Sequence, residues 1–590
     1  MNIYQSNKEQ FAKELLSINK KYTTISFLRL LSIVVFIGAL YLHLQQTETI
    51  YIALEILSFA TFILLMRYHA KLSIKRKLTE ALIEINENEN QYLESGSLHF
   101  ANGAVFNDFQ HPYAYDLDIF GDHSLFQNIN RTATYVGKKT LANQLLSVLP
   151  NEQILENQEA IAELSAKIDW RQEFFAYAKV TKDNKLSYEA LLAWSKFPST
   201  SLPKWTDIVS YVMPVLFVVT LSAYFITANS VFLTYLTYIF LINLAILGTF
   251  LKRIQIEIAN AEDIDKVISQ YASLIEQIEK EEFKSKKLIA LQEKLRYKDR
   301  TASVHLHKLS SLFSNMDTIG NLVAASLFNG SFLFNLHVLK RLLAWKEEHA
   351  SVLELWLEVI GEFEMLNSLG NLSYNNPSFV VPNLNSEAKI DFKNLSHPLL
   401  NSKSRVGNDA SFHPQSFMIL TGSNMSGKST FLRSLGINMV LSGIGSVVCA
   451  SEANVHPLPI LVSMRLSDSL SDSESYFFAE IKRLKLIMDA LEGQPAFVLL
   501  DEILRGTNSD DKRNGTIEVV KKVIAKKAIG AIATHDIEVC LTTHEFPDTL
   551  TNKCFEVEIV NNDLHFDYKL RDGICKNKSA TFLMKKIGVI

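Results

Sequence analysis

The chain has 590 residues, more than one hydrophobic core usually organises, so we expect roughly two to four domains. Hydrophobic residues make up 48% and charged residues 21%, which excludes a disordered or low-complexity chain and is typical of soluble domains that carry membrane segments. A formal net charge of -4 excludes a global basic field for nucleic acid, and four cysteines without a Cys-x-x-Cys pair indicate neither a disulfide framework nor a zinc site.

Two apolar runs lie near the start of the chain, at residues 25–44 and 50–66, and a short polar stretch separates them. A second pair follows at about 208–226 and 231–251. Each run approaches the ~20 residues that a helix needs to cross a bilayer. A cleaved signal peptide is not followed at once by a matching return span. We therefore predict two transmembrane hairpins, with buried core helices as the alternative.

The charges around the apolar runs predict their orientation. Neither connecting loop contains Lys or Arg, whereas basic residues lie beside the outer ends of both hairpins. By the positive-inside tendency, both termini and both large segments face the cytoplasm, which corresponds to the inner membrane of a bacterium. Arg29 and Glu55 lie close enough to span ends to reach the headgroups, so we assign them no conduction role.

The middle of the chain has a helical pattern. Residues 252–300 carry Glu, Lys, Ile and Leu at helical spacing, which predicts a long, charge-laced helix of lever or coiled-coil type. Residues 301–375 are again helical, so the second hairpin lies within a helical region. The alternative interpretation is an ordinary helical core with a solvated face.

A phosphate-binding motif follows in the last third. Residues 417–421 predict a strand that leads into Gly422-x4-Gly427-Lys428-Ser429 and then an amphipathic helix, which is the context that a P-loop requires. Loop amides and the helix N-terminus favour phosphate, Lys428 reaches the outer phosphates, and the Ser429 hydroxyl is suited to Mg²⁺. The predicted ATP-binding residues of this motif are Gly422, Ser423, Asn424, Met425, Ser426, Gly427, Lys428, Ser429 and Thr430.

Two further strands end in polar residues. Residues 496–500 precede Asp501-Glu502, an arrangement that places one carboxylate near magnesium and the next beside an attacking water. Residues 529–533 precede Thr534-His535, where the histidine is a candidate γ-phosphate contact. A lone histidine is more often structural. The three strand ends together predict Asp501 and Ser429 as metal ligands and Glu502 and His535 as catalytic residues.

These motifs resemble the ATPase domain of the MutS family. The resemblance rests on Gly-Ser-Asn-Met-Ser-Gly-Lys-Ser-Thr at 422–430 and on Asp-Glu-Ile-Leu-Arg-Gly-Thr at 501–507. It implies a domain of the ABC/MutS type that dimerises through composite nucleotide sites. Ser475 begins a stretch similar to the family's signature, and the resemblance assigns it a contact in trans with the opposite subunit's nucleotide. The Gly-Arg expected before that serine is replaced by Ser-Glu.

Arg405 marks another departure from the family pattern. It stands where the family has an aromatic residue that stacks on adenine, and a guanidinium plane can also stack on a base. We therefore include Arg405 among the predicted nucleotide-binding residues.

The resemblance extends weakly to the helical region. Residues 116–164 are similar to the start of the MutS core and residues 354–371 to its return helix. Because residues 1–100 are taken up by the predicted hairpin, we expect no mismatch-recognition domain there, and we expect no helix-turn-helix tail after the ATPase segment. The predicted domains are an N-terminal segment with the first hairpin at 1–80, the start of the MutS-like core at 81–205, the second hairpin at 206–252, lever and return helices at 253–375, and the ATPase domain at 376–590.

The predicted fold is thus an α/β P-loop ATPase domain joined to an all-α core with four transmembrane helices. The predicted function is a membrane-tethered, homodimeric, Mg²⁺-dependent ATP hydrolase that couples ATP to lever movement. The family suggests DNA as a ligand, including mismatched DNA and damage sensing, but fold does not dictate function and DNA stays an open partner.

Two alternatives remain. One is an ABC-type transport or remodelling ATPase that acts on a protein or lipid. Its signature Leu-Ser-Gly-Gly is absent, and Ser-x-Phe-x-x-Glu stands before Asp501 instead. The other is a scaffold that binds nucleotide without turnover, against which the intact Lys428, Ser429 and Glu502 argue.

Overall fold

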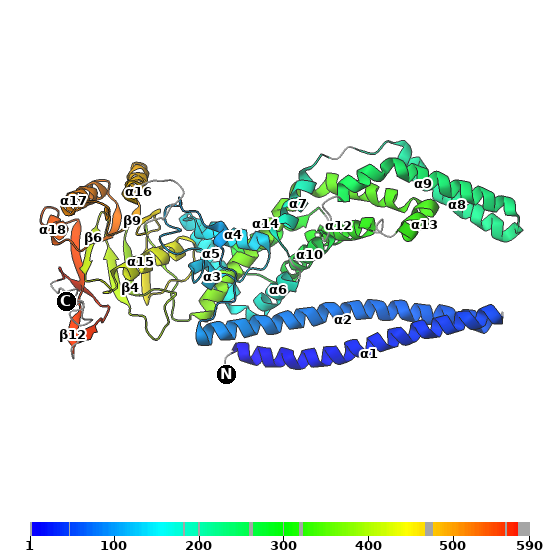
Figure 1. The fold of residues 1–590 in the computed structure, drawn as a ribbon, viewed down its shortest axis with the longest axis horizontal. Helices are drawn as coiled ribbons and strands as arrows, with labels where there is room; N and C mark the ends of the chain where they lie inside the picture. Colours follow the sequence, from blue (N-terminus) through cyan, green and yellow to red (C-terminus); the bar gives the residue numbers. More distant parts are fainter. Residues whose placement is uncertain are drawn as a thin grey trace.

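The computed structural model describes residues 3–46, 48–180, 183–198, 201–258, 264–298, 300–317, 322–465, 476–560 and 563–575. Within these residues the molecule is elongated (Figure 1). An α/β domain occupies one end, a helical core the middle, and two pairs of long helices extend to the other end.

The first pair consists of α1 (Ile3–Gln45) and α2 (Thr49–Ser95), which lie antiparallel along most of their length (Figure 1). At 1.5 Å per residue each helix is about 65–70 Å long, well beyond the ~30 Å hydrocarbon core of a bilayer. Inside the pair, His43 Nδ1 lies 2.9 Å from Glu55 Oε1, and the Arg29 guanidinium lies over the Phe62 ring. Gly96, in the left-handed region at φ 73°, ends α2 by donating its N–H to Tyr92 O.

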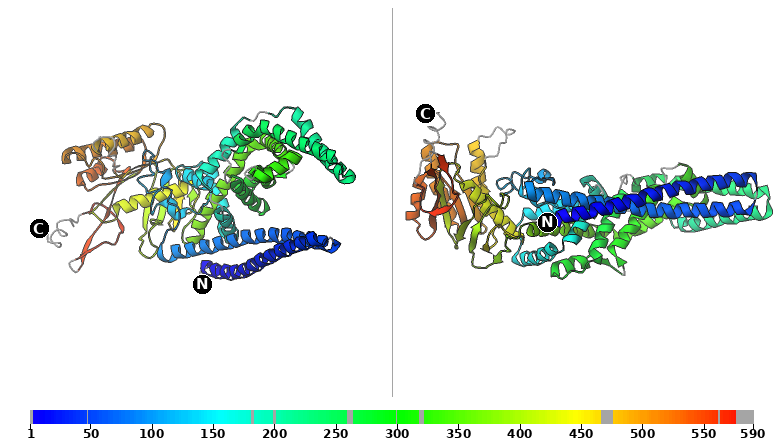
Figure 2. Two further views of the ribbon diagram at one scale, coloured as in Figure 1. Left: turned by 45° about the vertical axis from the view of Figure 1, so that its right-hand side comes forward. Right: turned by 90° about the horizontal axis from the view of Figure 1, so that it is seen from below.

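The second pair consists of α8 (Trp205–Thr227) and α9 (Ser230–Ile258). The tips of both pairs point to the end of the molecule that is remote from the α/β domain, as all three views agree (Figures 1 and 2). Among the described residues, these four helices are long and apolar enough to cross a membrane. Only 6–11% of their most apolar windows is buried inside the protein, which argues against the alternative of core helices.

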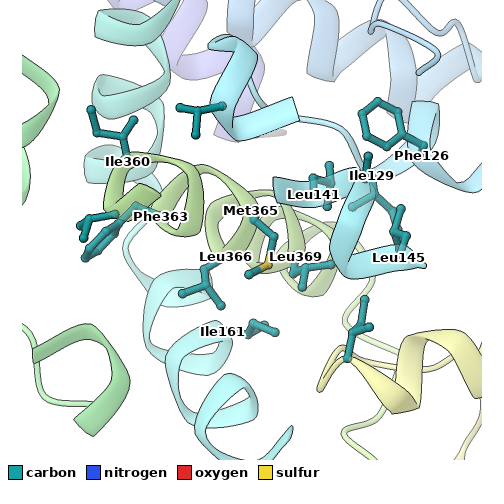
Figure 3. Packing of buried hydrophobic residues seen from close by; sticks show 14 of the residues in the cluster. Phe126, Ile129, Leu141, Leu145, Ile161, Ile360, Phe363, Met365, Leu366 and Leu369 are labelled. Atoms are coloured by element: carbon teal, nitrogen blue, oxygen red, sulfur yellow. The ribbon is translucent and has the colours of Figure 1, made fainter. Parts of the chain in front are cut away.

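The helical core lies between the pairs and the α/β domain. Its long axis is α14 (Phe334–Asn375), which packs against α4 and α5, with Leu366 and Leu369 among the buried residues of this region (Figure 3). The other elements of this region are η1 (Ala104–Phe106), α3 (Leu125–Ile129), α4 (Tyr135–Leu145), α5 (Asn151–Ala166), α6 (Ile168–Val180), α7 (Lys185–Lys196), α10 (Ile264–Lys280), α11 (Lys286–Glu293), β1 (Arg296–Tyr297), β2 (Arg300–Thr301), α12 (Ala302–Asp317) and α13 (Leu322–Phe332).

The prediction of one long helix over residues 252–300 is wrong. After α9 the chain forms α10, α11 and a two-stranded hairpin, and the break after α10 has a packing cause. Phe283 inserts its ring beside Trp170 and Phe363, with centroid distances of 5.5 and 5.3 Å. Ser285 then caps α11 by accepting the N–H of Leu288. The helical spacing of charged and apolar residues does not indicate that Phe283 packs into the core and ends the helix.

A buried polar junction joins α1 and α2 to the core. The Glu89 side chain is 3% exposed and forms an ion pair with the buried guanidinium of Arg131. Its carboxylate also accepts hydrogen bonds from the side chains of Asn371 and Asn375 on α14, at 3.1 and 3.0 Å. The Tyr4 hydroxyl of α1 donates to Asn375 Oδ1 at 2.7 Å. The C-terminal end of α14, which leads into the α/β domain, is therefore bonded to both helices of the first pair.

The α/β domain is built on a six-stranded sheet of order β14-β11-β6-β10-β9-β8, in which all strands except β14 are parallel to their neighbours. Strands β6, β9 and β10 are completely buried, as expected of a parallel sheet covered on both faces. The strands are β6 (Phe417–Gly422), β8 (Ile460–Ser463), β9 (Phe497–Asp501), β10 (Ile529–Ala533), β11 (Leu550–Phe555) and β14 (Leu570–Asp572), and the helices α15 (Lys428–Gly443), α16 (Tyr476–Ala490), α17 (Ser509–Ala525), α18 (Ile537–Leu541) and η3 (Thr542–His544).

A second sheet of order β3-β7-β4-β5 completes the domain, together with a small β12–β13 hairpin. Its strands are β3 (Asn383–Leu384), β4 (Ile390–Leu395), β5 (Asn408–Phe412) and β7 (Glu452–Val455), and the hairpin comprises β12 (Glu558–Val560) and β13 (Asp563–His565).

The junction at Glu89 generates a stability prediction. Glu89→Ala leaves the Arg131 guanidinium buried without its counter-charge, a loss of roughly 3–5 kcal/mol. We expect a lower midpoint of thermal unfolding for the detergent-solubilised protein. Glu94→Ala, an exposed carboxylate on the same helix, is the matched control and should leave the midpoint unchanged. Equal midpoints for the two variants would contradict the role of Glu89.

Candidate active site

The candidate site forms where three adjacent strands end. In the sheet, β10 pairs with β6 on one side and with β9 on the other, all parallel, so Ala533 lies opposite Leu420 and Asp501. The carboxyl ends of neighbouring parallel strands open at one edge of a sheet, the usual place for ligands in α/β domains. This pairing gathers the loop after β6, Asp501-Glu502 and His535 at a single edge.

The loop after β6 connects directly to the N-terminus of α15. Gly422 and Gly427 have φ of 156° and 106°, and a Cβ at Gly422 would lie 2.6 Å from Ser426 Oγ and 2.9 Å from Phe555 O. Only glycine fits such a close approach. Lys428 is buried and donates its ammonium to Gly422 O and Ser423 O at 2.9 and 3.0 Å. Burial lowers the pKa of the Lys428 ammonium.

Ser429 and Asp501 meet beside this loop. The Ser429 hydroxyl donates to Asp501 Oδ2 at 2.6 Å. Asp501 Oδ1 is also buried, and it has no hydrogen-bond partner among the described residues. Burial raises the pKa of the Asp501 carboxyl, although the Ser429 hydrogen bond acts in the opposite direction. A buried carboxylate oxygen without a partner is costly. A hydroxyl and a carboxylate are hard oxygen ligands, so this pair fits Mg²⁺.

Glu502 and His535 form the second pair. Their Oε1 and Nε2 atoms are 2.6 Å apart, and Lys428 Nζ lies 3.5 Å from the same histidine nitrogen. The hydrogen bond with His535 lowers the pKa of Glu502 to about 2, with further contributions from the charges of Arg505 and Lys428. Glu502 is therefore ionised at neutral pH. Its backbone is in the left-handed region, at φ 48°, which sets it apart from the strand that precedes it.

Sequence reasoning missed the role of Glu480 on α16. Its carboxylate accepts the backbone N–H groups of Leu504 and Arg505 at 2.7 and 3.2 Å. Arg505 in turn donates to the carbonyl oxygens of Glu502 and Asp501, at 2.9 and 3.3 Å. The turn that holds the two acidic residues is thus fixed from α16. The sequence motif around Glu480 does not indicate this contact, because it joins two separate segments of the chain.

The structure places the aromatic ring of Tyr568 beside the phosphate loop. A Cβ at Gly427 would lie 3.1 Å from the Tyr568 ring, and Phe566 stacks on that ring at a centroid distance of 6.0 Å. Asn408 fixes the segment by donating to Tyr568 O at 3.0 Å. The Arg405 guanidinium lies over Phe379, at 5.1 Å from the centroid. Tyr568 is distant in sequence from the loop, so no local motif indicates it.

Of the remaining predicted site residues, those of the phosphate loop lie in the described structure and Ser475 does not. Asn424 and Met425 lie in the loop, with Met425 exposed and in the left-handed region at φ 68°, and Thr430 begins α15 with Lys428 and Ser429. The Ser423 and Ser426 hydroxyls are buried without a hydrogen-bond partner among the described residues. Ser475 lies outside the described residues, as do the Ser-Glu pair before it.

The helical core supplies one wall of the site. A cavity of 440 Å³ beside the Ser429 and Asp501 pair is also lined by Tyr115 from the core. The next core residue, Asp116, accepts the backbone N–H groups of Met464 and Arg465 at 2.7 and 2.9 Å. The other lining residues are Arg433, Met464, Arg465 and Arg505. The Ser429–Asp501 pair is therefore adjacent to the core.

Comparisons with known proteins agree with the sequence resemblance. Residues 418–589 match the family model described as MutS domain V. The chain is 28% identical over 41% of its length to the DNA mismatch repair protein MutS of Thermotoga petrophila and 32% identical over 32% to that of Methanococcoides burtonii. It is 29% identical over 31% of its length to the human MutS protein homolog 4. The matches span 31%, 22% and 20% of these three relatives. The predicted relation to the MutS family is confirmed for this part of the chain.

Proposed function

We propose that this chain, whose C-terminal domain is of the MutS type, is a membrane-tethered, Mg²⁺-dependent ATPase that couples ATP to movement of its helical core. The observation that carries the proposal is the convergence of Lys428, the Ser429–Asp501 pair and the Glu502–His535 pair at three adjacent strand ends. Such groups supply positioning and charge stabilisation, which is most of what phosphoryl transfer requires.

Each group has a role in that proposal. The loop amides and Lys428 bind the phosphates, and Lys428 exchanges its two carbonyl contacts for phosphate oxygens. Ser429 and Asp501 hold Mg²⁺, which neutralises charge on the phosphate oxygens when bound. Glu502, ionised at neutral pH, orients the attacking water, and His535 lies between Glu502 and Lys428 where it can contact the terminal phosphate. Ser475 is proposed to complete the site of the opposite subunit in a homodimer.

The membrane part of the proposal rests on the two helix pairs. Their apolar surfaces are exposed, and their tips lie together at the end remote from the α/β domain (Figures 1 and 2). One bilayer can hold both pairs in that arrangement, with the ATPase domain in the cytoplasm of a bacterium. The direction of insertion follows from the basic residues beside the outer ends of the pairs.

The ligand of the moving core is proposed to be DNA. Two relatives are named DNA mismatch repair protein, and this chain matches less than a third of their length. The competing assignment is a protein or lipid partner, as for an ABC-type remodelling ATPase. The exposed apolar helices are the observation that favours this alternative. Neither assignment changes the chemistry proposed at the nucleotide.

Hydrolysis is tested with variants of the full chain in detergent. We expect Mg²⁺-dependent release of phosphate from ATP, reduced at least about a hundredfold by Lys428→Ala because transition-state charge loses a fixed cation. Glu502→Gln should slow turnover by roughly 10²–10⁴-fold while ATP still binds. Lys485→Ala, an exposed lysine on α16, is the control and should hydrolyse at the parent rate. Equal rates in all four proteins would refute the assigned roles.

We propose that Tyr568, whose ring lies beside Gly427, stacks on the nucleobase. Stacking of an aromatic side chain on a base contributes about 1–3 kcal/mol, so Tyr568→Ala should weaken ATP binding roughly 5- to 150-fold. Tyr568→Phe keeps the ring and should bind as the parent does. Affinity would be measured by titration with a fluorescent ATP analogue. A loss of affinity in Arg405→Ala with none in Tyr568→Ala would instead return the stacking role to Arg405.

The ligand of the core is tested through the ATPase rate. If DNA is the ligand, duplex, mismatched or branched DNA should change the rate of hydrolysis and bind with an affinity that falls steeply with salt. The chain without DNA, and DNA with Lys428→Ala, are the controls. A rate that no DNA changes would move the assignment to a protein or lipid partner.

A further inference from the structure

The helix α13 carries an apolar surface that no part of the described protein covers. Val323, Leu327 and Phe328 are 78%, 59% and 50% exposed. The sequence around them is equally apolar, since residues 318–339 contain no Asp, Glu, Lys or Arg. An exposed run of this kind marks an interaction surface.

The length of α13 excludes a full transmembrane span. It has 11 residues, so it is about 16 Å long, roughly half of the ~30 Å hydrocarbon core. The helix ends because Leu333, at φ 50°, turns the chain into α14.

Contacts with α8 and α9 place α13 beside the apolar part of these helices, away from their basic end. Asn243 of α9 donates its side-chain amide to Gly330 O at 2.8 Å, and a Cβ at Gly330 would meet the Phe240 ring at 2.2 Å. On the other side, Phe332 packs edge-on against Phe217 of α8, at a centroid distance of 5.8 Å. Asn243 lies nine residues before Lys252, so this contact is about 13 Å along α9 from the basic end of the span.

A second measure of depth comes from α14. Lys340 is bonded to Asp207 Oδ1 at 2.6 Å and to Ser210 Oγ at 3.2 Å, near the outer end of α8. The turn at Leu333 lies seven residues earlier, or about 10 Å farther toward the tip of the pair. The two independent measures thus agree. The turn and the adjacent Gly330 contact lie about 10–13 Å from the level of Lys252 and Lys340, toward the tip of the pair.

The turn satisfies its backbone groups internally, as a segment surrounded by lipid must. The N–H of Leu333 donates to Asn329 O at 3.0 Å, and that of Asn335 to Asn329 Oδ1 at 2.8 Å. Leu336 donates its N–H to Leu333 O at 3.0 Å. Asn329 is itself buried, so its polar atoms are directed into the turn rather than outward.

We infer that α13 and the start of α14 form a re-entrant element that enters the bilayer beside α8 and α9 and turns back at Leu333, with Val323, Leu327 and Phe328 against lipid acyl chains. The inference rests on the proposed membrane location of α8 and α9, with which the surface is continuous. It adds a membrane-embedded part to the helix that leads into the α/β domain, so bilayer and nucleotide domain are joined through one continuous helix, α14.

The test uses the full chain in phosphatidylcholine vesicles with a nitroxide attached at single introduced cysteines. Leu327→Cys and Val323→Cys report on α13, so one site remains if the other disturbs folding. Val219→Cys, 58% exposed on α8, is the lipid reference, and Leu186→Cys, 79% exposed on α7, is the water reference. The parent chain, with its four cysteines, gives the background.

Collisions of the nitroxide with O₂ and with a water-soluble nickel chelate are then compared. We expect the α13 sites to favour O₂ over nickel by a ratio that matches Val219→Cys and exceeds Leu186→Cys. A ratio equal to that of Leu186→Cys would overturn the inference. Protection from both reagents would also overturn it, in favour of a second copy of the chain covering α13. If Val219→Cys itself reports water, the proposed membrane tether fails, a result distinct from failure of α13 alone.

Discussion

The parallel pairing of β6, β10 and β9 is the constraint on which the site depends. Because β10 lies between the other two strands, His535 follows a strand that separates the phosphate loop from Asp501 and Glu502, and it contacts both Lys428 and Glu502. The pairing also buries all three strands, so polar groups can be placed only where the strands end. The burial that stabilises the sheet is therefore also what concentrates charge at one edge.

The same sheet edge is connected to the distant helices through packed contacts. The C-terminal end of α15 docks on α5, where Leu149 donates its N–H to Gly443 O at 2.9 Å and the buried Asn157 side chain donates to Ile444 O at 2.8 Å. Helix α5 packs on α14 (Figure 3), and α14 is bonded to Glu89 of α2. A shift of α15 on nucleotide binding has a continuous path to α2. Such a path is a structural connection. Coupling along it has to be measured, for example as the effect of Glu89→Ala on the ATPase rate.

Local signals explain how much the sequence could predict. The phosphate loop, Asp501-Glu502 and His535 each follow an apolar strand, so a few consecutive residues are enough to predict their positions at a sheet edge. Tyr568 and Glu480 act through contacts between segments far apart in sequence, which no spacing rule reveals. The prediction of one long helix over residues 252–300 failed for a related reason. A periodic pattern predicts a helix but not the single residue that packs inward or adopts a left-handed backbone and ends it.

The position of the membrane restricts the kind of movement that ATP can drive. If both helix pairs and the turn at Leu333 lie in one bilayer, none of them can be withdrawn from it freely, because withdrawal would expose apolar surface to water. The buried Glu89–Arg131 pair likewise resists sliding of α2 along the helical core, since a displaced charge would be left without its partner. Under the proposed function, the freedom that remains is movement of the α/β domain relative to the membrane-held helices. Under the proposed function, a ligand of the core is then one that lies close to the membrane face, whether it is DNA, protein or lipid.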